Sequence, residues 1–239
     1  MLFLRSLLFS LYFYISVIIF TLFFVVLSPF IGQKRRFNLT SVYISMLLIT
    51  LKFLCQIDWK VKGSILSKNP VVIVSNHQGL WESFYLQTLV SPLTTIIKKE
   101  LIYVPFFGWA LNLLNPIKID RSKKIQSAKR VIAKGSEKLE DGYSVLVFPE
   151  GTRSQKGKLQ EAQKGLGLLV VKSGASVIPA RISGTNEVLG KGMMFPRLGR
   201  KVELRLGKEI HKNQLIDTDV IKERYQNISD KVMSEISLL

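Results

Sequence analysis

One uncharged stretch near the start of the chain limits what the chain can fold into. Residues 6 to 33 read SLLFSLYFYISVIIFTLFFVVLSPFIGQ and contain no Lys, Arg, Asp or Glu. As a helix, the part before Pro29 would be about 35 Å long at about 1.5 Å per residue. That length can cross a hydrocarbon core of about 30 Å. The apolar part is too long for a secretory signal peptide, and no small-x-small cleavage site follows it. We therefore expect a retained membrane anchor.

A second apolar run follows a break marked by Pro29 and Gly32. This run covers residues 38 to 57, and its helical spacing puts several polar residues on one side, namely Asn38, Ser41, Ser45, Lys52 and Gln56. An amphipathic helix of this kind either packs on the core of a domain or lies in the membrane interface. The pattern favours neither alternative, and one helix can do both.

The charge distribution predicts an orientation. The first 57 residues carry five Lys or Arg residues and no Asp or Glu, and three of these cations, Lys34, Arg35 and Arg36, directly follow the first apolar run. By the positive-inside rule, the rest of the chain should face the cytoplasm, at the inner membrane of a bacterium. Two full spans would put it on the far side, so one span or two shallowly embedded helices fits better. We expect anchoring helices at residues 1–57 and an α/β domain at residues 58–239.

From residue 59 onward, short apolar segments alternate with helical patterns. The predicted strands are residues 71–74, 95–97, 144–148, 176–179 and 202–206, which are rich in Val and Ile or alternate apolar and charged residues. The predicted helices are residues 81–90, 123–140, 161–173 and 216–236. An alternation of strands and helices predicts an α/β fold, with a mostly parallel sheet covered by helices.

Polar residues follow two of these predicted strands. The strand at 71–74 is followed by Ser75, Asn76 and His77, with Glu82 five residues after the histidine. The strand that ends at Phe148 is followed by Glu150, Gly151, Thr152 and Arg153. In open α/β sheets, ligands bind beyond the carboxyl ends of the strands. We therefore expect both clusters at the same edge of the sheet.

His77 and Glu82 are candidates for acid–base chemistry. A neutral imidazole is the commonest general base, and a carboxylate can fix its tautomer and stabilise its cation. Positions five apart on a regular helix lie about 140° from each other, so the pair meets only if the chain turns near Gly79. The alternative is an exposed His with a solvated Glu in the first turn of a helix. The sequence has no G-x-S-x-G motif, and Cys55 lies in an apolar helix. We therefore expect His77 to activate a hydroxyl of a substrate.

The second cluster, FPEGTRS at residues 148–154, suggests an anion site. Gly151 permits close approach of the backbone, Thr152 offers a hydroxyl, and the Arg153 guanidinium matches a phosphate bidentately. The alternative is a polar turn with Glu150 paired to Arg153. The net charge of +17 also favours an anionic partner. Nucleic acid is the least favoured partner, because the aromatic residues are concentrated in the apolar N-terminal part.

Four segments of the sequence resemble the motifs of one family. NHQGLWE at 76–82 resembles the N-H-x-x-x-x-D block of glycerolipid acyltransferases, and FPEGTRS matches their third block. KKELIYVPFFGWALNLLNPIKIDR at 98–121 resembles the second block, and VIPARISG at 177–184 resembles the fourth. The blocks occur in the order of the family and cover close to half of the chain. The chain is most similar to the 1-acyl-sn-glycerol-3-phosphate (lysophosphatidic acid) acyltransferases, which also have an N-terminal membrane-embedded helix pair.

The resemblance implies a reaction and roles for the candidate residues. An acyl group would move from a thioester, on coenzyme A or acyl carrier protein, to the sn-2 hydroxyl of lysophosphatidic acid, giving phosphatidic acid. His77 would take the hydroxyl proton, and Glu82, where the family usually has Asp, would orient the imidazole. Gly151, Thr152 and Arg153 would hold the phosphate, Glu150 would shape their loop, and Arg121 with Lys98 or Lys99 would add positive charge.

The expected partners are membrane lipids, lysophosphatidic acid and the acyl donor. The resemblance implies no cofactor, no metal and no covalent acyl-enzyme. One Cys and two His are also too few for a Cys/His zinc site. Two other functions stay open on the residues alone. One is acylation of another lysophospholipid or lyso-lipid, and the other is capture of anionic lipid by a membrane-tethered protein without catalysis.

Overall fold

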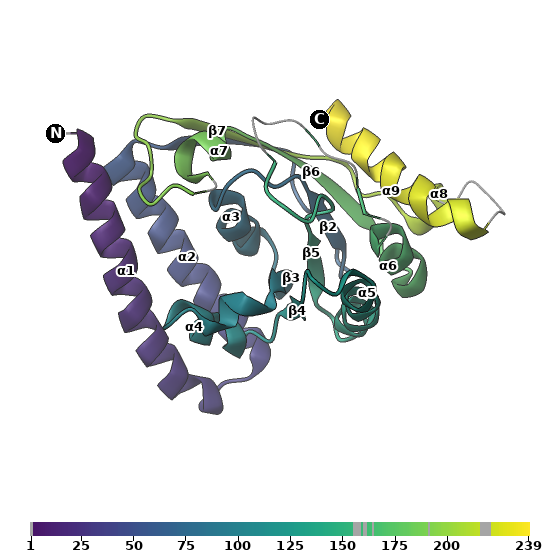
Figure 1. The fold of residues 1–239 in the computed structure, drawn as a ribbon, viewed down its shortest axis with the longest axis horizontal. Helices are drawn as coiled ribbons and strands as arrows, with labels where there is room; N and C mark the ends of the chain where they lie inside the picture. The colour runs from purple at the N-terminus through teal and green to yellow at the C-terminus, as the bar shows by residue number, and fades with distance from the viewer. Residues whose placement is uncertain (1, 155–158, 160–161, 164, 191, 216–220) are drawn as a thin grey trace.

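The computed structural model describes the chain except for residues 1, 155–158, 160–161, 164, 191 and 216–220. A seven-stranded sheet runs through the described part in the order β1-β7-β6-β2-β5-β3-β4 (Figure 1). Its strands are β1 (Asp58–Lys62), β2 (Val72–Ser75), β3 (Leu93–Lys98), β4 (Ile117–Ile119), β5 (Ser144–Val147), β6 (Val177–Ser183) and β7 (Lys201–Leu206). Each predicted strand is present, with ends shifted by a few residues.

The sheet is mostly parallel, which confirms the predicted fold class. Strands β6, β2, β5, β3 and β4 run in one direction, whereas β7 pairs antiparallel with β6 and β1 runs parallel to β7. The sequence did not predict β1 or β4. Strand β4 has only three residues, and β1 alternates exposed and half-buried residues at the edge of the sheet, so neither forms a clear apolar run.

Helices cover both faces of the sheet. The described helices after the N-terminal pair are α3 (Trp81–Leu89), η2 (Lys99–Tyr103), α4 (Phe107–Leu113), α5 (Lys124–Glu140), α6 (Gly165–Ser173), α7 (Thr185–Leu189), α8 (Lys212–Leu215) and α9 (Ile221–Leu238). Helices α3, α5, α6 and α9 match the predicted helices. Parts of the predicted starts at 161–164 and 216–220 lie outside the described residues. The short helices η2, α4, α7 and α8 were not predicted.

The two apolar runs form an antiparallel pair, α1 (Leu2–Leu27) and α2 (Gln33–Cys55), joined by the short helix η1 (Ser28–Phe30) (Figure 1). The break at Pro29 and Gly32 falls where it was predicted, but α2 begins earlier than residue 38. Arg36 in its first turn donates hydrogen bonds to the carbonyls of Ser28 (2.6 Å) and Leu113 (3.3 Å). This side chain therefore ties the turn of the helix pair to the end of α4.

One side of the helix pair packs on the α/β part. Ile44, Leu48 and Leu51 of α2 share a core with Trp81 and Leu86 of α3, so the packing alternative for this helix is confirmed. That core crosses the predicted boundary at residues 57/58, and the division into two segments stays a prediction. The opposite side of α2 exposes Val42, Met46, Ile49 and Phe53. Contact of this stripe with a membrane also remains a prediction.

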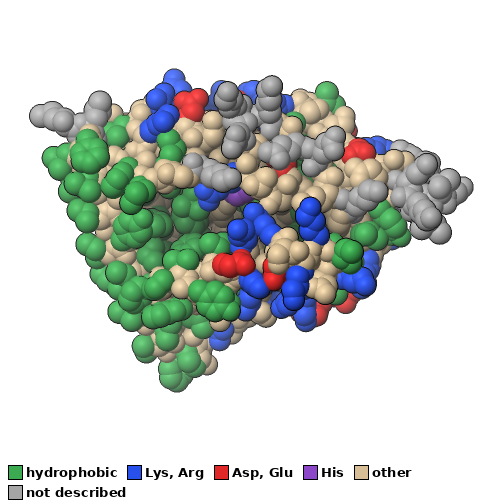
Figure 2. Space-filling model, viewed as in Figure 1, with side chains coloured by type: hydrophobic (Ala, Val, Ile, Leu, Met, Phe, Trp, Pro, Cys, Tyr) green, Lys and Arg blue, Asp and Glu red, His purple; other side chains and the backbone are tan. Residues whose placement is uncertain are grey.

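The outward side of α1 is apolar along its whole length. Its exposed large apolar residues include Phe3, Leu4, Leu8, Leu11, Ile15, Ile19, Leu22, Phe23 and Val26. Figure 2 shows this apolar surface over α1 and α4, at the left of the molecule. By length and composition, both α1 and α2 could cross a membrane.

Candidate active site

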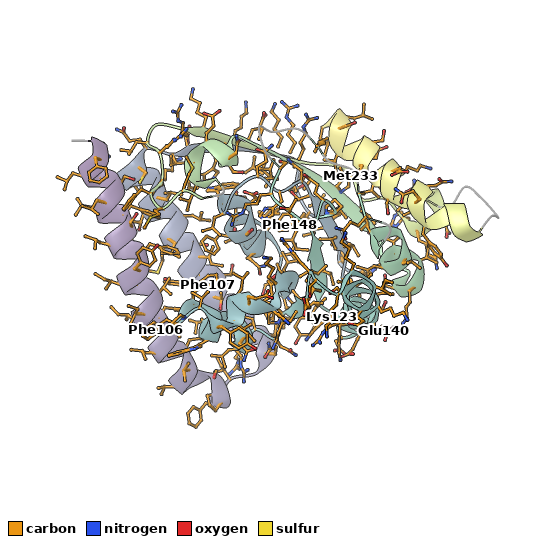
Figure 3. The ribbon with its side chains drawn as sticks, in the orientation of Figure 1. Phe106, Phe107, Lys123, Glu140, Phe148 and Met233 are labelled. Atoms are coloured by element: carbon orange, nitrogen blue, oxygen red, sulfur yellow. The ribbon has the colours of Figure 1, made fainter. Side chains whose placement is uncertain are left out.

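The two polar clusters meet because β2 and β5 are neighbouring parallel strands. Val74 of β2 is level with Val147 of β5, so the residues that follow each strand face one another. The imidazole of His77 stacks on the ring of Phe148, with 4.1 Å between centroids and 19° between planes. Figure 3 places Phe148 near the middle of the molecule, between the helix pair and α5. The carboxyl edge of the sheet therefore carries both clusters, as predicted.

Backbone hydrogen bonds join the two loops directly. The N–H of Ser154 donates to the carbonyl of His77 at 2.7 Å, and the Ser154 hydroxyl donates to the same carbonyl at 3.2 Å. The N–H of His77 donates to Oε1 of Glu150 at 3.3 Å. The loop after β5 thus binds the backbone of His77 at both ends, its N–H through Glu150 and its carbonyl through Ser154.

His77 and Glu82 form a hydrogen-bonded pair. Nδ1 of His77 lies 2.9 Å from Oε1 of Glu82, and the same oxygen accepts the backbone N–H groups of Gln78 (2.6 Å) and Gly79 (2.7 Å). The Glu82 side chain is fully buried. The alternative of a solvated Glu is therefore wrong. The longer side chain of Glu reaches the ring because position 82 lies in the first turn of α3 and points back to the preceding turn.

Gly79 makes this turn possible by its size. A Cβ at this position would lie 2.5 Å from the carbonyl oxygen of Thr185, at the start of α7. The backbone of the turn therefore packs against α7 more closely than any other residue would permit. The sequence suggested a turn at Gly79, and the structure shows that close packing is the reason for the glycine.

The local environment favours the charged form of Glu82. Burial by itself would raise the pKa of this carboxyl, but the hydrogen bond and charge of His77 and the N–H of Gly79 outweigh it, so the pKa is lowered. An ionised Glu82 can accept a hydrogen bond from the Nδ1–H of the imidazole, which leaves Nε2 as the ring nitrogen that can exchange a proton with a substrate. The His77 side chain is 14% exposed. The pair therefore has the geometry of an imidazole held by a carboxylate, which a general base of this kind requires.

The loop after β5 turns at Gly151 and carries Thr152 and Arg153. Gly151 has a φ of +68°, and the side-chain amide of Gln163 occupies the space that a Cβ would need. Thr152 and Arg153 are partly buried beside it. Arg121 follows β4 at the same edge of the sheet. Its pKa is lowered by partial burial and by the charge of Arg153, with an opposing effect of Glu100. Two guanidinium groups therefore act on each other at this edge.

The two candidate lysines at the end of β3 differ from each other. Nζ of Lys99 lies 2.5 Å from Oδ2 of Asp120. This lysine and Ser122 hold the pKa of the Asp120 carboxyl well below its usual range. Lys98 is exposed and forms no ion pair within the described part of the chain. Of the two, Lys98 therefore has the charge that is not balanced by a carboxylate.

Three contributors to the site, Asn76, Phe148 and Ser154, were given no role by the sequence. The Asn76 amide exchanges hydrogen bonds with the backbone of Ile182, at 2.9 and 2.7 Å, which fixes the end of β2 to β6. All three lie inside motifs that the sequence analysis quoted. Motif membership was the available signal, but the direction of each side chain depends on the strand order.

This arrangement is that of an α/β enzyme with a histidine–carboxylate pair beside a cationic loop. A family model described as Acyltransferase matches residues 57–183, which include every site residue named above. The match covers more than half of the chain, and the chain belongs to this family.

Curated relatives and a solved structure agree with the family. A 1-acyl-sn-glycerol-3-phosphate acyltransferase of Pseudomonas aeruginosa is 44% identical over 124 residues, which are 52% of this chain and 48% of that protein. One of Saccharomyces cerevisiae is 31% identical over 188 residues, covering 70% of this chain and 62% of the relative. The chain thus spans about half the length of the curated relatives it matches.

The crystal structure of the 1-acyl-sn-glycerophosphate (LPA) acyltransferase PlsC from Thermotoga maritima resembles the whole fold. It aligns with a TM-score of 0.77 and 25% identity over 100% of this chain and 97% of that chain. The likeness therefore extends over the N-terminal helix pair as well as the α/β part.

Proposed function

We propose that this protein transfers an acyl group from a thioester to the sn-2 hydroxyl of 1-acyl-glycerol-3-phosphate. The names of the relatives support this acceptor. The observation that carries the proposal is the His77–Glu82 pair, at 2.9 Å, joined directly to the loop that contains Arg153. One site thus combines a base for a hydroxyl with cations for a phosphate.

In the proposed reaction, Nε2 of His77 takes the proton of the acceptor hydroxyl. The hydroxyl oxygen then attacks the thioester carbonyl, a C–O bond forms, and the C–S bond breaks. The thiolate leaves with the proton from His77, so the products are phosphatidic acid and a free thiol. Ionised Glu82 stabilises the imidazolium between these steps. Glu150 and Ser154 would act on the reaction through the His77 backbone, so they are positioning residues.

The phosphate of the acceptor would lie between Arg153 and Arg121. Partial burial lowers the pKa of Arg121, and repulsion by Arg153 lowers it further against the opposing effect of Glu100. A phosphate dianion would convert this repulsion into two charge-assisted attractions. Gly151 and Thr152 would add close backbone approach and a hydroxyl, and Lys98 would add a further unbalanced cation.

An apolar cavity offers room for an acyl chain. It has a volume of about 170 Å³ and lies where α1, α2 and α3 meet, with Phe13, Leu48, Trp81, Phe84 and Met194 among its lining residues. Trp81 follows His77 by only four positions in the sequence, so one wall of the cavity is close to the candidate base along the chain. We propose that the helix pair both walls this cavity and embeds in a membrane leaflet, with the α/β part on the cytoplasmic side.

The proposal can be tested with purified protein, one acyl thioester and a panel of lysolipids that differ only in headgroup. We expect 1-acyl-glycerol-3-phosphate to have the highest kcat/KM. Equal or faster acylation of a choline or ethanolamine lysolipid would contradict the assigned acceptor. The proposal includes no metal or other cofactor, so a chelator should leave the rate unchanged.

A further inference from the structure

A separate groove lies at the N-terminal end of α1, outside the site described above. It is open to the surface, has a volume of about 460 Å³, and lies between the start of α1, the end of α2 and the loop from α7 to β7. Figure 1 shows this loop beside the start of α1, at the upper left of the molecule. The lining residues are Phe3, Ser6, Gln56, Phe195, Pro196, Arg197, Leu198, Gly199 and Arg200, and we call these nine residues the α1 groove. None of them is a candidate residue of the acyl-transfer site, so that reaction does not account for the groove.

Hydrogen bonds fix the loop that forms one wall of the α1 groove. The Ser6 hydroxyl donates to the carbonyl of Pro196 at 2.5 Å, which joins the loop to α1. The N–H of Gly199 donates to the carbonyl of Cys55 at 3.0 Å, which joins the loop to the last residue of α2. The groove is therefore formed before any ligand binds, and a ligand does not have to order this wall.

The polar side of the α1 groove is cationic. Arg197 and Arg200 line it, and none of its nine lining residues is Asp or Glu. Arg197 is exposed and forms no ion pair within the described part of the chain. Arg200 lies 3.4 Å from Glu187, but both side chains are about half exposed, and such a pair contributes little. Both guanidinium groups can therefore bind an anion, and their geometry matches that of a phosphate.

The other side of the α1 groove is apolar and continues the outward surface of α1. The rings of Phe3 and Phe195 form an edge-to-face contact with 5.9 Å between their centroids, and Leu198 lies in the same loop. Phe3 is 68% exposed and is the first of the large apolar residues along the outward side of α1. A free anion would use only the arginines. A ligand that is anionic at one end and apolar at the other would use both sides of the groove.

We propose that the α1 groove binds one anionic phospholipid of the membrane. Its phosphate would lie at Arg197 and Arg200, and the first carbons of one acyl chain would lie on Phe3 and Phe195. This lipid is neither the acceptor nor the donor of the proposed acyl transfer, and the site does not depend on that reaction. An open groove suits such a ligand, because the second acyl chain can stay among the surrounding lipids. Pro196 also lines the cavity between α1, α2 and α3, so the bound lipid would lie beside that cavity.

The test titrates the purified full-length protein, in a nonionic detergent, with a short-chain phosphatidylglycerol and follows binding by calorimetry. We expect saturable binding whose Kd rises about tenfold or more in Arg197→Gln/Arg200→Gln, because charge-assisted hydrogen bonds to the phosphate are lost. A phosphatidylcholine with the same chains should bind about tenfold more weakly than phosphatidylglycerol, because its own cation balances the phosphate and faces the arginines. Inorganic phosphate should also bind about tenfold more weakly, because it buries no CH₂ groups on the apolar side.

The matched control is Lys34→Gln/Arg35→Gln, which removes two exposed cations at the other end of the helix pair. It should leave binding of the short-chain phosphatidylglycerol unchanged, although both double variants should bind anionic vesicles less well. Phe3→Ala keeps both arginines of the groove. It should weaken binding of phosphatidylglycerol about threefold and leave binding of inorganic phosphate unchanged.

Each other outcome overturns the lipid site. Equal affinity of the wild type and Arg197→Gln/Arg200→Gln, or an equal loss in the control, would refute binding at the groove. Equal binding of the two lipids would show that the groove does not select an anionic headgroup. Inorganic phosphate that binds as tightly as phosphatidylglycerol would make the groove an anion site and refute the lipid. If the double variant unfolds at a lower temperature without lipid, Arg197→Gln alone decides, because Arg197 forms no ion pair within the described residues. The lysolipid panel tests the acyl transfer separately, so either proposal can fail alone.

Discussion

Helices α1 and α5 lie on two sides of the same site and differ in what they expose. The outward side of α1 presents large apolar residues such as Leu11, Ile15 and Ile19, whereas the first half of α5 presents four cations. Helix α5 buries one face and hydrates the other, but α1 is apolar on both. The proposed function would place the site at a boundary between lipid and water, with the apolar side of α1 toward the lipid and the charged side of α5 toward the water.

The largest expected effect comes from removing the base and leaving both surfaces intact. His77→Ala should lower the rate of acyl transfer by about 10²–10⁴, the usual contribution of a general base. Thermal unfolding and vesicle co-sedimentation should match those of the wild type. Full activity in this variant would rule out His77 as the base.

The role of the apolar outward side of α1 can be tested by placing charged residues on it. Ile15→Lys/Ile19→Lys should lower vesicle binding by about 100-fold or more, because each Lys costs up to about 3 kcal/mol in a hydrocarbon environment and about 2.8 kcal/mol in total already corresponds to 100-fold. Leu66→Lys is the control, since Leu66 is also an exposed apolar residue but lies in the loop between β1 and β2. If α1 does not contact lipid, both variants will bind vesicles as the wild type does.

The cationic side of the comparison can be tested at Arg153, in the loop after β5. Arg153→Ala should raise the KM for 1-acyl-glycerol-3-phosphate about tenfold or more, because a hydrogen bond between charged groups contributes about 1.5–3 kcal/mol. The KM for a monoacylglycerol, which lacks the phosphate, should change little. Steady-state kinetics with both acceptors give the comparison, and an equal effect on the two would show that Arg153 does not bind phosphate.

Two substitutions of Glu82 separate the effect of its charge on the His77–Glu82 pair from the effect of its length. Glu82→Gln should lower kcat about tenfold, because the neutral amide no longer stabilises the imidazolium. Glu82→Asp should cost less, since the carboxylate is kept while its reach is shortened. The kcat of each variant, measured at saturating substrate, tests this order. A larger loss of kcat in Glu82→Asp would mean that the reach of the side chain matters more than its charge.

The smallest expected effect is on the acid stability of the fold. The pKa of Glu82 is lowered in the folded protein, so its contribution is present above the unfolded value of about 4.3 and is lost as the pH falls below it. Glu82→Gln cannot titrate, so its melting temperature should fall less steeply between about pH 5 and about pH 3. Parallel curves for the two proteins would mean that Glu82 is not preferentially ionised in the fold.

The sequence predicted the strands that form the middle of the sheet better than those at its edges. Residues 71–74 and 145–148 are fully apolar because both faces of β2 and β5 are covered, and such runs are easy to recognise. The edge strands β1 and β4 are partly exposed or very short, so they carry no comparable pattern. The candidate site was predictable because it follows the two recognisable strands.

The sequence by itself determined the apolar N-terminal pair, the α/β alternation and the two polar clusters after β2 and β5, because each is a local pattern. Only the tertiary structure decided that Glu82 reaches back to His77 and that Ser154 binds the His77 carbonyl. It also decided that α5 presents its cations beside that pair. These contacts depend on which strands are neighbours, and strand order is set by packing over long separations in the chain that no local pattern records.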